Sequence, residues 1–303
     1  MKSLAKILIF ASLLPLQGCF FTGVESTPKI TAGQVRRDAP TLVTADDTLL
    51  AQVGPLAFPL WKPGMLFRVT DPRVSLIFGL PDSEGQRLNG HSLSYLGASE
   101  SRGVTGIGVT DLQFLSPDGQ TFTYRVNRPL ASIDGLDIPF TIQTGMVSDA
   151  DSLLRGRNVY VLSSVWRDDS DNPRRGRKFV PVTIDSVRPG TTGFPLKVAF
   201  TDTAGVGGRL FMYPGRKGSA SRTFSDLFTS DNPRLKYPQI TDENWQLITR
   251  GRLAEGMTGQ EVRLSIGAPK EITRNPTQSF LREAWYYDSG HYLLFEDGLL
   301  KRF

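Results

Sequence analysis

The sequence predicts an α+β protein: a mainly β N-terminal and middle region, in one or two small barrel- or sandwich-like modules, then a small C-terminal α-α-β-β-β domain. Three observations lead to this prediction. Apolar and polar residues alternate in runs between about residues 53 and 220, as in half-buried strands. Thirty Gly and twenty Pro are spread along the 303 residues without a period, which favours a turn-rich β protein. After residue 241 the apolar spacing becomes helical and then alternates again.

Composition limits the functions open to this chain. Hydrophobic residues make up 39% and charged residues 21%, so there are enough apolar side chains for a folded core. With one Cys, neither an intramolecular disulfide nor a cysteine-based zinc cluster can form, and two His leave little imidazole chemistry. The formal net charge of +5 includes Lys2 and Lys6, which lie in the leader described next. The remaining chain is mildly basic, which does not indicate a nucleic-acid partner.

Residues 1–18 are predicted to be a lipoprotein signal peptide. Two lysines precede an apolar run at residues 7–16 that is too short to span a bilayer. The run leads into Leu16-Gln17-Gly18-Cys19, which resembles the lipobox of bacterial lipoproteins. The resemblance implies that Cys19 carries lipid chains such as palmitate, that the peptide before it is removed, and that the new N-terminus is acylated. Several acyl chains on one residue give a stable membrane anchor.

The residues after the lipobox indicate where the anchor would be sorted. Phe20, and not Asp, follows Cys19, and no acidic run comes after it. By resemblance to lipoprotein sorting in bacteria with two membranes, neither retention in the inner membrane nor export to the cell surface is signalled. We therefore expect a lipid-anchored protein of the outer membrane that faces the periplasm.

The chain after the leader divides into four predicted segments. They are a lipidated tether at 19–52, two β-rich modules at 53–147 and 148–220, and the C-terminal domain at 221–303. The modules contain hairpin signals at 109–126 and 182–200, each with strand-like alternation on either side of a Pro/Gly turn. These two hairpins indicate either a weak internal repeat or a chance likeness between hairpins.

The C-terminal domain is predicted from caps and turns. A helix begins at Thr241 and ends at Gly251, and a second begins with the capping box formed by Thr258 and Glu261. Gly267 and a nearby proline end the second helix. Three strands are predicted at 279–287, 291–296 and 299–303, the last two joined by an Asp-Gly turn.

A family resemblance appears over about residues 245–303. The residues that carry it are Gly256-Met257-Thr258, Glu261-Val262, Gly267 with Pro269, Trp285 with Tyr287, and Phe295 with Asp297-Gly298-Leu299. This set resembles the SmpA/OmlA (BamE-like) family of small outer-membrane lipoproteins. The resemblance implies an α-α-β-β-β fold. It also implies a role as an accessory subunit of the machinery that inserts β-barrels into the outer membrane.

No catalytic site, metal site or cofactor is predicted. His91 and His291 each follow a glycine in a turn, lie far apart in sequence and lack a ligand-spaced partner. Residues 90–94 miss the last glycine of the G-x-S-x-G elbow. The densest basic run, residues 174–178, is either a solvated loop or a contact for anionic headgroups or lipopolysaccharide phosphates.

A candidate partner-binding surface follows from strand alternation. We expect Trp285, Tyr287, Leu293 and Phe295 to face the two C-terminal helices. The opposite face then presents Tyr286, Tyr292 and Leu294, a tyrosine-rich patch of the kind favoured in interfaces. The patch either packs on the chain's own β region or binds another protein.

Taken together, the sequence predicts a non-enzymatic outer-membrane lipoprotein. It would act through protein–protein contacts in envelope assembly or maintenance. Its expected partners are the membrane, through the lipid, and other envelope proteins, among them the β-barrel assembly machinery. A peptidoglycan- or glycan-binding lipoprotein is the alternative, and an unrecognised hydrolase is a third. The oligomeric state is left open.

Overall fold

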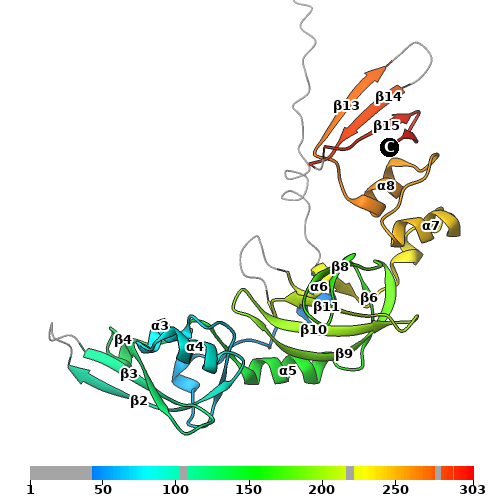
Figure 1. Ribbon diagram of the computed structural model, residues 1–303. Helices are drawn as coiled ribbons and strands as arrows, with labels where there is room; N and C mark the ends of the chain where they lie inside the picture. Colours follow the sequence, from blue (N-terminus) through cyan, green and yellow to red (C-terminus); the bar gives the residue numbers. More distant parts are fainter. Residues whose placement is uncertain (1–42, 103–107, 216–221, 277–280, 289) are drawn as a thin grey trace, which may run out of the picture. The chain divides into compact units, whose positions relative to one another are not determined.

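The computed structural model describes residues 43–102, 108–215, 222–276, 281–288 and 290–303 (Figure 1). In this part the protein is mixed α+β and mainly β, as predicted, with its strands in three antiparallel sheets. Residues 43–303 form one compact unit. Cys19 and most of the predicted tether lie outside the described residues.

Sheet A has five strands in the order β4-β3-β2-β1-β5. They are β1 (Leu66–Val69), β2 (Ser92–Arg102), β3 (Gly108–Leu115), β4 (Thr121–Val126) and β5 (Thr141–Gln143). Two short helices, α3 (Val74–Phe78) and α4 (Asp82–Leu88), connect β1 to β2, and single 3-10 turns occur at Phe58–Leu60 and Leu130–Ser132. The core is aromatic: the Phe67 and Phe114 rings meet edge to face at 5.4 Å.

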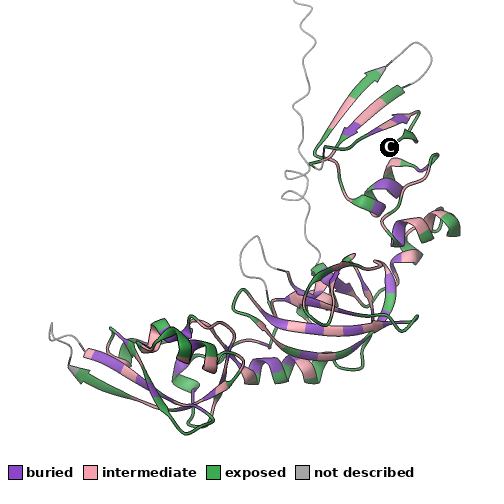
Figure 2. Cartoon of the chain, viewed as in Figure 1, coloured by how far each residue is buried: buried purple, intermediate pink, exposed green. Residues whose placement is uncertain are grey.

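Sheet B has seven strands in the order β12-β6-β9-β10-β11-β7-β8. They are β6 (Asn158–Val161), β7 (Val165–Arg167), β8 (Pro173–Arg175), β9 (Val180–Thr191), β10 (Phe194–Asp202), β11 (Gly207–Met212) and β12 (Phe228–Thr229). Along β9, buried residues alternate with exposed ones (Figure 2). Helix α5 (Thr144–Leu154) packs against β9, and its buried residues Met146, Val147, Ala150 and Leu154 belong to the core of sheet B. This helix spans the module boundary predicted at residue 147.

The two predicted hairpins occupy different places in their sheets. β3 and β4 end sheet A at one edge, whereas β9 and β10 lie in the middle of sheet B. The strand upstream of each hairpin also pairs differently, because β6 pairs with β9 but β1 pairs with β2 and β5. The likeness between the two stretches therefore does not extend to a shared strand order.

The end of the predicted tether is part of the fold. Helix α2 (Ala45–Thr48) contacts α6 (Phe224–Leu227). The Asp47 carboxylate accepts a hydrogen bond from the Ser225 hydroxyl at 2.6 Å. Asp46 accepts from the Ser230 backbone N–H at 3.0 Å and from its hydroxyl at 2.7 Å. The described fold therefore includes residues 43–52, which the sequence places in the tether.

Sheet C forms the C-terminal part of the chain. Helices α7 (Asp242–Thr249) and α8 (Gly259–Ile266) begin at the predicted caps, and a 3-10 turn at Pro233–Lys236 precedes them. The sheet has four strands in sequential order: β13 (Glu271–Pro276), β14 (Leu281–Tyr286), β15 (Tyr292–Glu296) and β16 (Leu299–Arg302). The sequence predicts only three. β13 is the additional edge strand, and its short alternation around Ile272 is interrupted by charged residues and ends at Pro276.

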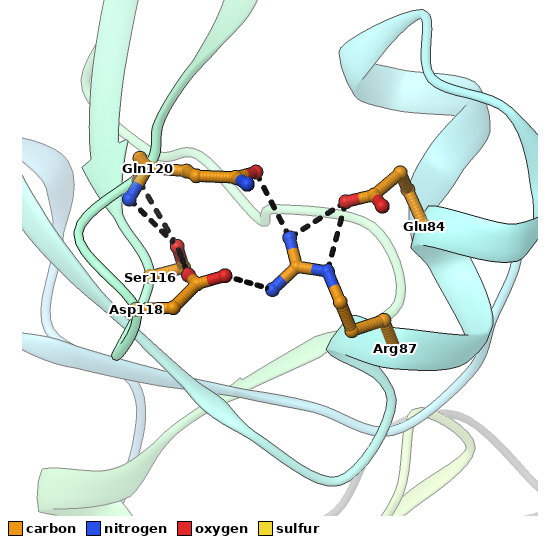
Figure 3. A network of polar contacts seen from close by, with 5 residues as sticks. All are labelled: Glu84, Arg87, Ser116, Asp118 and Gln120. Atoms are coloured by element: carbon orange, nitrogen blue, oxygen red, sulfur yellow. Dashed lines mark hydrogen bonds and ion pairs between the residues drawn. The ribbon is translucent and has the colours of Figure 1, made fainter.

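Arg87 of α4 ties this helix to the turn between β3 and β4 (Figure 3). Its guanidinium donates to Glu84 at 2.6 Å, to the Gln120 side chain at 3.0 Å, and to Asp118. The Ser116 hydroxyl donates to Asp118 from the other side. The hydrogen bond from Ser116, followed by the charge of Arg87, holds the pKa of Asp118 below its ordinary value. The polar turn is thus fixed to the helix beside it.

Candidate functional site

The inner face of sheet C is built around Trp285. This side chain is 2% exposed, and its ring centroid lies 4.4 Å from that of Phe295. A Cβ on Gly259 of α8 would lie 2.9 Å from the indole, so the helix approaches the ring closely because this residue has no side chain. The Arg263 guanidinium lies 4.4 Å from the ring centroid. Trp285, Leu293 and Phe295 are buried beneath the helices, as strand alternation predicts.

Two side chains of the inner face have shifted pKa values. Burial raises the pKa of Tyr287 to about 12, and its hydroxyl donates to the Gly267 carbonyl at 3.1 Å. Burial also acts to raise the pKa of Glu283. Hydrogen bonds from the Trp285 indole N–H at 3.0 Å and from Arg274 at 2.7 Å outweigh this effect and keep that pKa below its ordinary value. Both groups therefore help to fix the inner layer in place.

The outer face of sheet C presents the predicted tyrosines. Tyr286 and Tyr292 are directly paired across β14 and β15, with ring centroids 6.4 Å apart. They are 43% and 47% exposed, and Leu294 on the same face is half-buried. We call these three residues the tyrosine face. The described part of the chain does not bury the two rings.

The tyrosine face is flanked by polar residues of neighbouring strands. Glu271 of β13 is in register with Tyr286, and Arg302 of β16 is in register with Leu294. An apolar and aromatic centre with a charged rim is the usual composition of a protein-binding surface. Arrangement and exposure together make this face a candidate site for a partner.

The two histidines are not brought together. His91 lies in the turn between α4 and β2, beside sheet A, whereas His291 lies in the turn between β14 and β15 of sheet C. Both are exposed. Within the described residues, no three His, Cys, Asp or Glu side chains are grouped so that they could hold a metal ion. No helix in the described residues has the length and apolar character needed to cross a membrane.

The basic run at residues 174–178 has a structural context that the sequence does not reveal. Arg174, Arg175 and Arg177 line a cavity of about 320 Å³ together with Arg250 and Arg252, which follow α7. We call this the arginine cavity. Sequence reasoning identifies only the first three arginines, because the other two lie about 75 residues further along the chain. In the sequence, the cavity is indicated only by two basic stretches that contain a glycine, residues 174–178 and 250–252.

Comparison with known proteins adds no relatives. No protein-family model matches the chain, and no curated protein or solved structure matches it.

Proposed function

We propose that this chain is a lipid-anchored protein of the outer membrane that faces the periplasm. It acts without catalysis, through protein–protein contacts in envelope assembly or maintenance. Other envelope proteins are its partners. The β-barrel assembly machinery is the first of these to test, because the C-terminal residues resemble the SmpA/OmlA family.

The anchor is supported by the N-terminal sequence. The only Cys of the chain, Cys19, falls directly after Leu16-Gln17-Gly18 and a short apolar run. A thiol at this place can receive the lipid that the lipobox resemblance implies, and multiple acyl chains would hold the protein on the membrane stably. This part of the proposal rests on the sequence alone.

The contact role is supported by one observation above all, the exposed and directly paired rings of Tyr286 and Tyr292. Tyrosine is enriched at interfaces because it has a large apolar surface and a polar end, and it loses little side-chain entropy on binding. Trp285 lies on the opposite face of the sheet, where its buried indole packs against α8. This packing makes β14 a rigid support for the two tyrosines. A rigid support lowers the entropic cost of binding.

The likeness to a BamE-like α-α-β-β-β domain is also part of this proposal. Helices α7 and α8 precede the sheet in the expected order, and their residues pack with Trp285 in one core. The edge strand β13 is an addition to the three strands of the family pattern. We infer that the sheet presents its free face in the manner of an accessory subunit.

Site-specific photocrosslinking in cells tests the contact role. A photoreactive amino acid replaces Tyr292 in one strain and Leu76, which is 68% exposed on α3, in a control strain. We expect a defined envelope protein, identified by mass spectrometry, to be captured from position 292 and not from position 76. Equal capture at both positions, or none at 292, would reject the tyrosine face as the contact surface.

Cys19→Ala tests the anchor separately. The variant should remain an uncleaved, unacylated precursor that no longer fractionates with the outer membrane. Cleavage and fractionation like those of the native chain would refute the lipobox assignment. Binding of the purified protein to isolated sacculi, without any protein captured at position 292, would favour the glycan-binding alternative instead.

A further inference from the structure

The arginine cavity joins two segments that are distant in sequence. Its walls are Arg174, Arg175, Gly176 and Arg177 from the segment at the end of β8, and Arg250 and Arg252 from the segment after α7; Trp166, Asp202 and Val206 complete it. Its volume of about 320 Å³ is at the lower end of the range for small-molecule pockets, roughly 300–1,000 Å³. The cavity is large enough for a headgroup-sized ligand.

One backbone hydrogen bond, one bond from a side chain to the backbone and one ring contact hold the two segments together. The Arg175 guanidinium donates to the Gly251 carbonyl at 2.6 Å, and the Lys178 backbone N–H donates to the Thr249 carbonyl at 2.9 Å. The next residue, Phe179, stacks on Trp245 of α7 with ring centroids 5.7 Å apart. The convergence of the arginines is therefore supported by contacts between the two segments, one of them between main chains, and not only by the rotamers of the cavity-lining side chains.

Two glycines allow the close approach. A Cβ on Gly176 would overlap the indole of Trp166, which is fully buried and forms the floor of the cavity. The Arg174 guanidinium lies 5.8 Å from the centroid of the same ring. Gly251 has a φ of +62°, a left-handed conformation that suits glycine, and a Cβ there would lie 2.9 Å from the Arg175 guanidinium. The cavity thus has a rigid aromatic floor and a cationic rim.

The positive charge of the cavity is largely unbalanced. Asp202 is the one carboxylate in its lining, and it is already bonded to Arg177 at 2.7 Å and to the backbone N–H groups of Ala204 and Val206. Within the described residues, the other four arginines, 174, 175, 250 and 252, form no ion pair within 4.0 Å. The backbone N–H of Asn172, and to a smaller extent the charge of Arg174, hold the pKa of Asp168 below its ordinary value.

Lys178, which follows the arginines of the β8 segment, has a lowered pKa. Burial, followed by the charge of Arg175, lowers the pKa of Lys178 to about 8. A cation beside unpaired arginines is disfavoured for the same reason that an anion there is favoured. Burial is the larger cause of the shift, and the smaller contribution of Arg175 has the sign expected beside a cationic cavity.

We propose that the arginine cavity binds a phosphate-bearing ligand. Guanidinium groups present planar forks that match phosphate oxygens two at a time. Four arginines without an ion pair favour a ligand with more than a single negative charge, and a phosphomonoester supplies about −1.5 to −2 near neutral pH. The ligand is either the phosphate headgroup of a lipid or a soluble phosphate ester. This inference is independent of the tyrosine face.

The test uses the mature chain, residues 19–303, with Cys19→Ala so that no acyl chain attaches it to membranes. Calorimetry measures binding of inorganic phosphate and of glucose 6-phosphate at constant ionic strength. Cosedimentation measures binding to phosphatidylcholine vesicles with and without phosphatidic acid. We expect saturable binding in at least one of these arms. Binding to vesicles alone identifies a lipid headgroup, and binding to glucose 6-phosphate in solution identifies a soluble ester.

Matched arginine variants locate the site. Arg250→Ala with Arg252→Ala removes two exposed residues of the cavity rim, and Arg128→Ala with Arg188→Ala removes two exposed arginines elsewhere that form no ion pair in the described part. Both double variants lose the same charge. We expect the first to weaken binding by about tenfold or more, since it loses charge-assisted hydrogen bonds to phosphate, and the second by less than about twofold.

Two results would overturn the proposal. One is an equal loss of binding in the two double variants, which would show only nonspecific attraction to a basic surface. The other is the absence of binding to phosphate, to glucose 6-phosphate and to phosphatidic acid vesicles by a chain whose thermal unfolding is cooperative. Thermal unfolding of both variants serves as the control for folding, and we expect melting temperatures close to that of the parent chain.

Discussion

Tyr286 and Tyr292 reach the surface because two paired strands alternate, whereas Arg250 and Arg252 reach Arg174 only because the end of α7 is bonded to the segment after β8. The tyrosine face is therefore a local product of one hairpin. The arginine cavity is a tertiary product that depends on two glycines and a buried tryptophan. Changes within the hairpin should leave the cavity intact, and changes in the cavity floor should leave the tyrosine face intact.

The largest expected effect comes from the support of the tyrosine face. Trp285→Ala removes a fully buried indole and should lower the free energy of unfolding of sheet C by about 3–5 kcal/mol. Urea denaturation followed by tyrosine fluorescence and circular dichroism measures this. Trp285→Phe is the control, because it keeps a ring against Phe295 while losing the bond to Glu283, and it should cost about 1–2 kcal/mol. Equal costs for the two variants would contradict the packing role of the indole.

The next largest change in the free energy of unfolding is expected from a substitution at the floor of the arginine cavity. In Gly176→Ala the new methyl group overlaps the Trp166 indole, so the segment must shift, at a cost of about 1–3 kcal/mol in the free energy of unfolding. Gly145→Ala in α5 is the matched control, because a Cβ there meets nothing within 4 Å. It should be neutral or stabilising by up to about 1 kcal/mol. A neutral Gly176→Ala would mean that Trp166 does not form a rigid floor.

Lys178, which lies beside the arginine cavity and not on the tyrosine face, should make the free energy of unfolding depend on pH. Its pKa falls from 10.5 to about 8 in the folded chain, so the unfolded chain binds more protons between these values and stability rises with pH across that window. Below pH 8 the cost of holding the charge is fully present. Lys178→Met should therefore stabilise the protein by about 1 kcal/mol at neutral pH, a figure reduced for partial solvent screening. Denaturation of both chains on either side of pH 8 checks this, and an unchanged difference across the window would be incompatible with it.

The smallest effect is expected on the tyrosine face. Tyr286→Ser with Tyr292→Ser removes one cross-strand aromatic pair and should cost less than about 1 kcal/mol in the free energy of unfolding. Capture of the partner by a photoreactive amino acid placed at Leu294, on the same face, should nevertheless be lost. A loss of several kcal/mol would show that the two rings are internal, and would end the docking interpretation.

The sequence predicts best where structure is local. The caps at Thr241 and Thr258 and the burial of Trp285, Leu293 and Phe295 follow from patterns within a few residues. Helices α3 and α4 contain five and seven residues, too few to show a helical period. Chain-distant contacts leave no periodic signal at all.

Two examples show what chain-distant contacts decide. Asp46 and Asp47, which the sequence places in the tether, join the fold through bonds to Ser230 and Ser225, more than 170 residues away. Two of the five arginines of the cavity come from a segment that composition marks only as a helix end. In both cases the individual residues are ordinary and their juxtaposition is specific.

The hydrogen bonds from Arg87 and Ser116 to Asp118 also affect how this protein would age chemically. An aspartate followed by glycine converts to isoaspartate when the glycine backbone nitrogen attacks the side-chain carboxyl. Water leaves to give a succinimide, and a second water then opens this ring at the backbone carbonyl. At Asp118 that carboxyl is held by Ser116 and Arg87, and the Gly119 N–H is bonded to the Ser116 carbonyl at 3.0 Å. Asp134, which precedes Gly135, is exposed and has no such bonds in the described part of the chain. During long storage, isoaspartate should accumulate at Asp134 well before Asp118, and peptide mapping of aged protein would record that order.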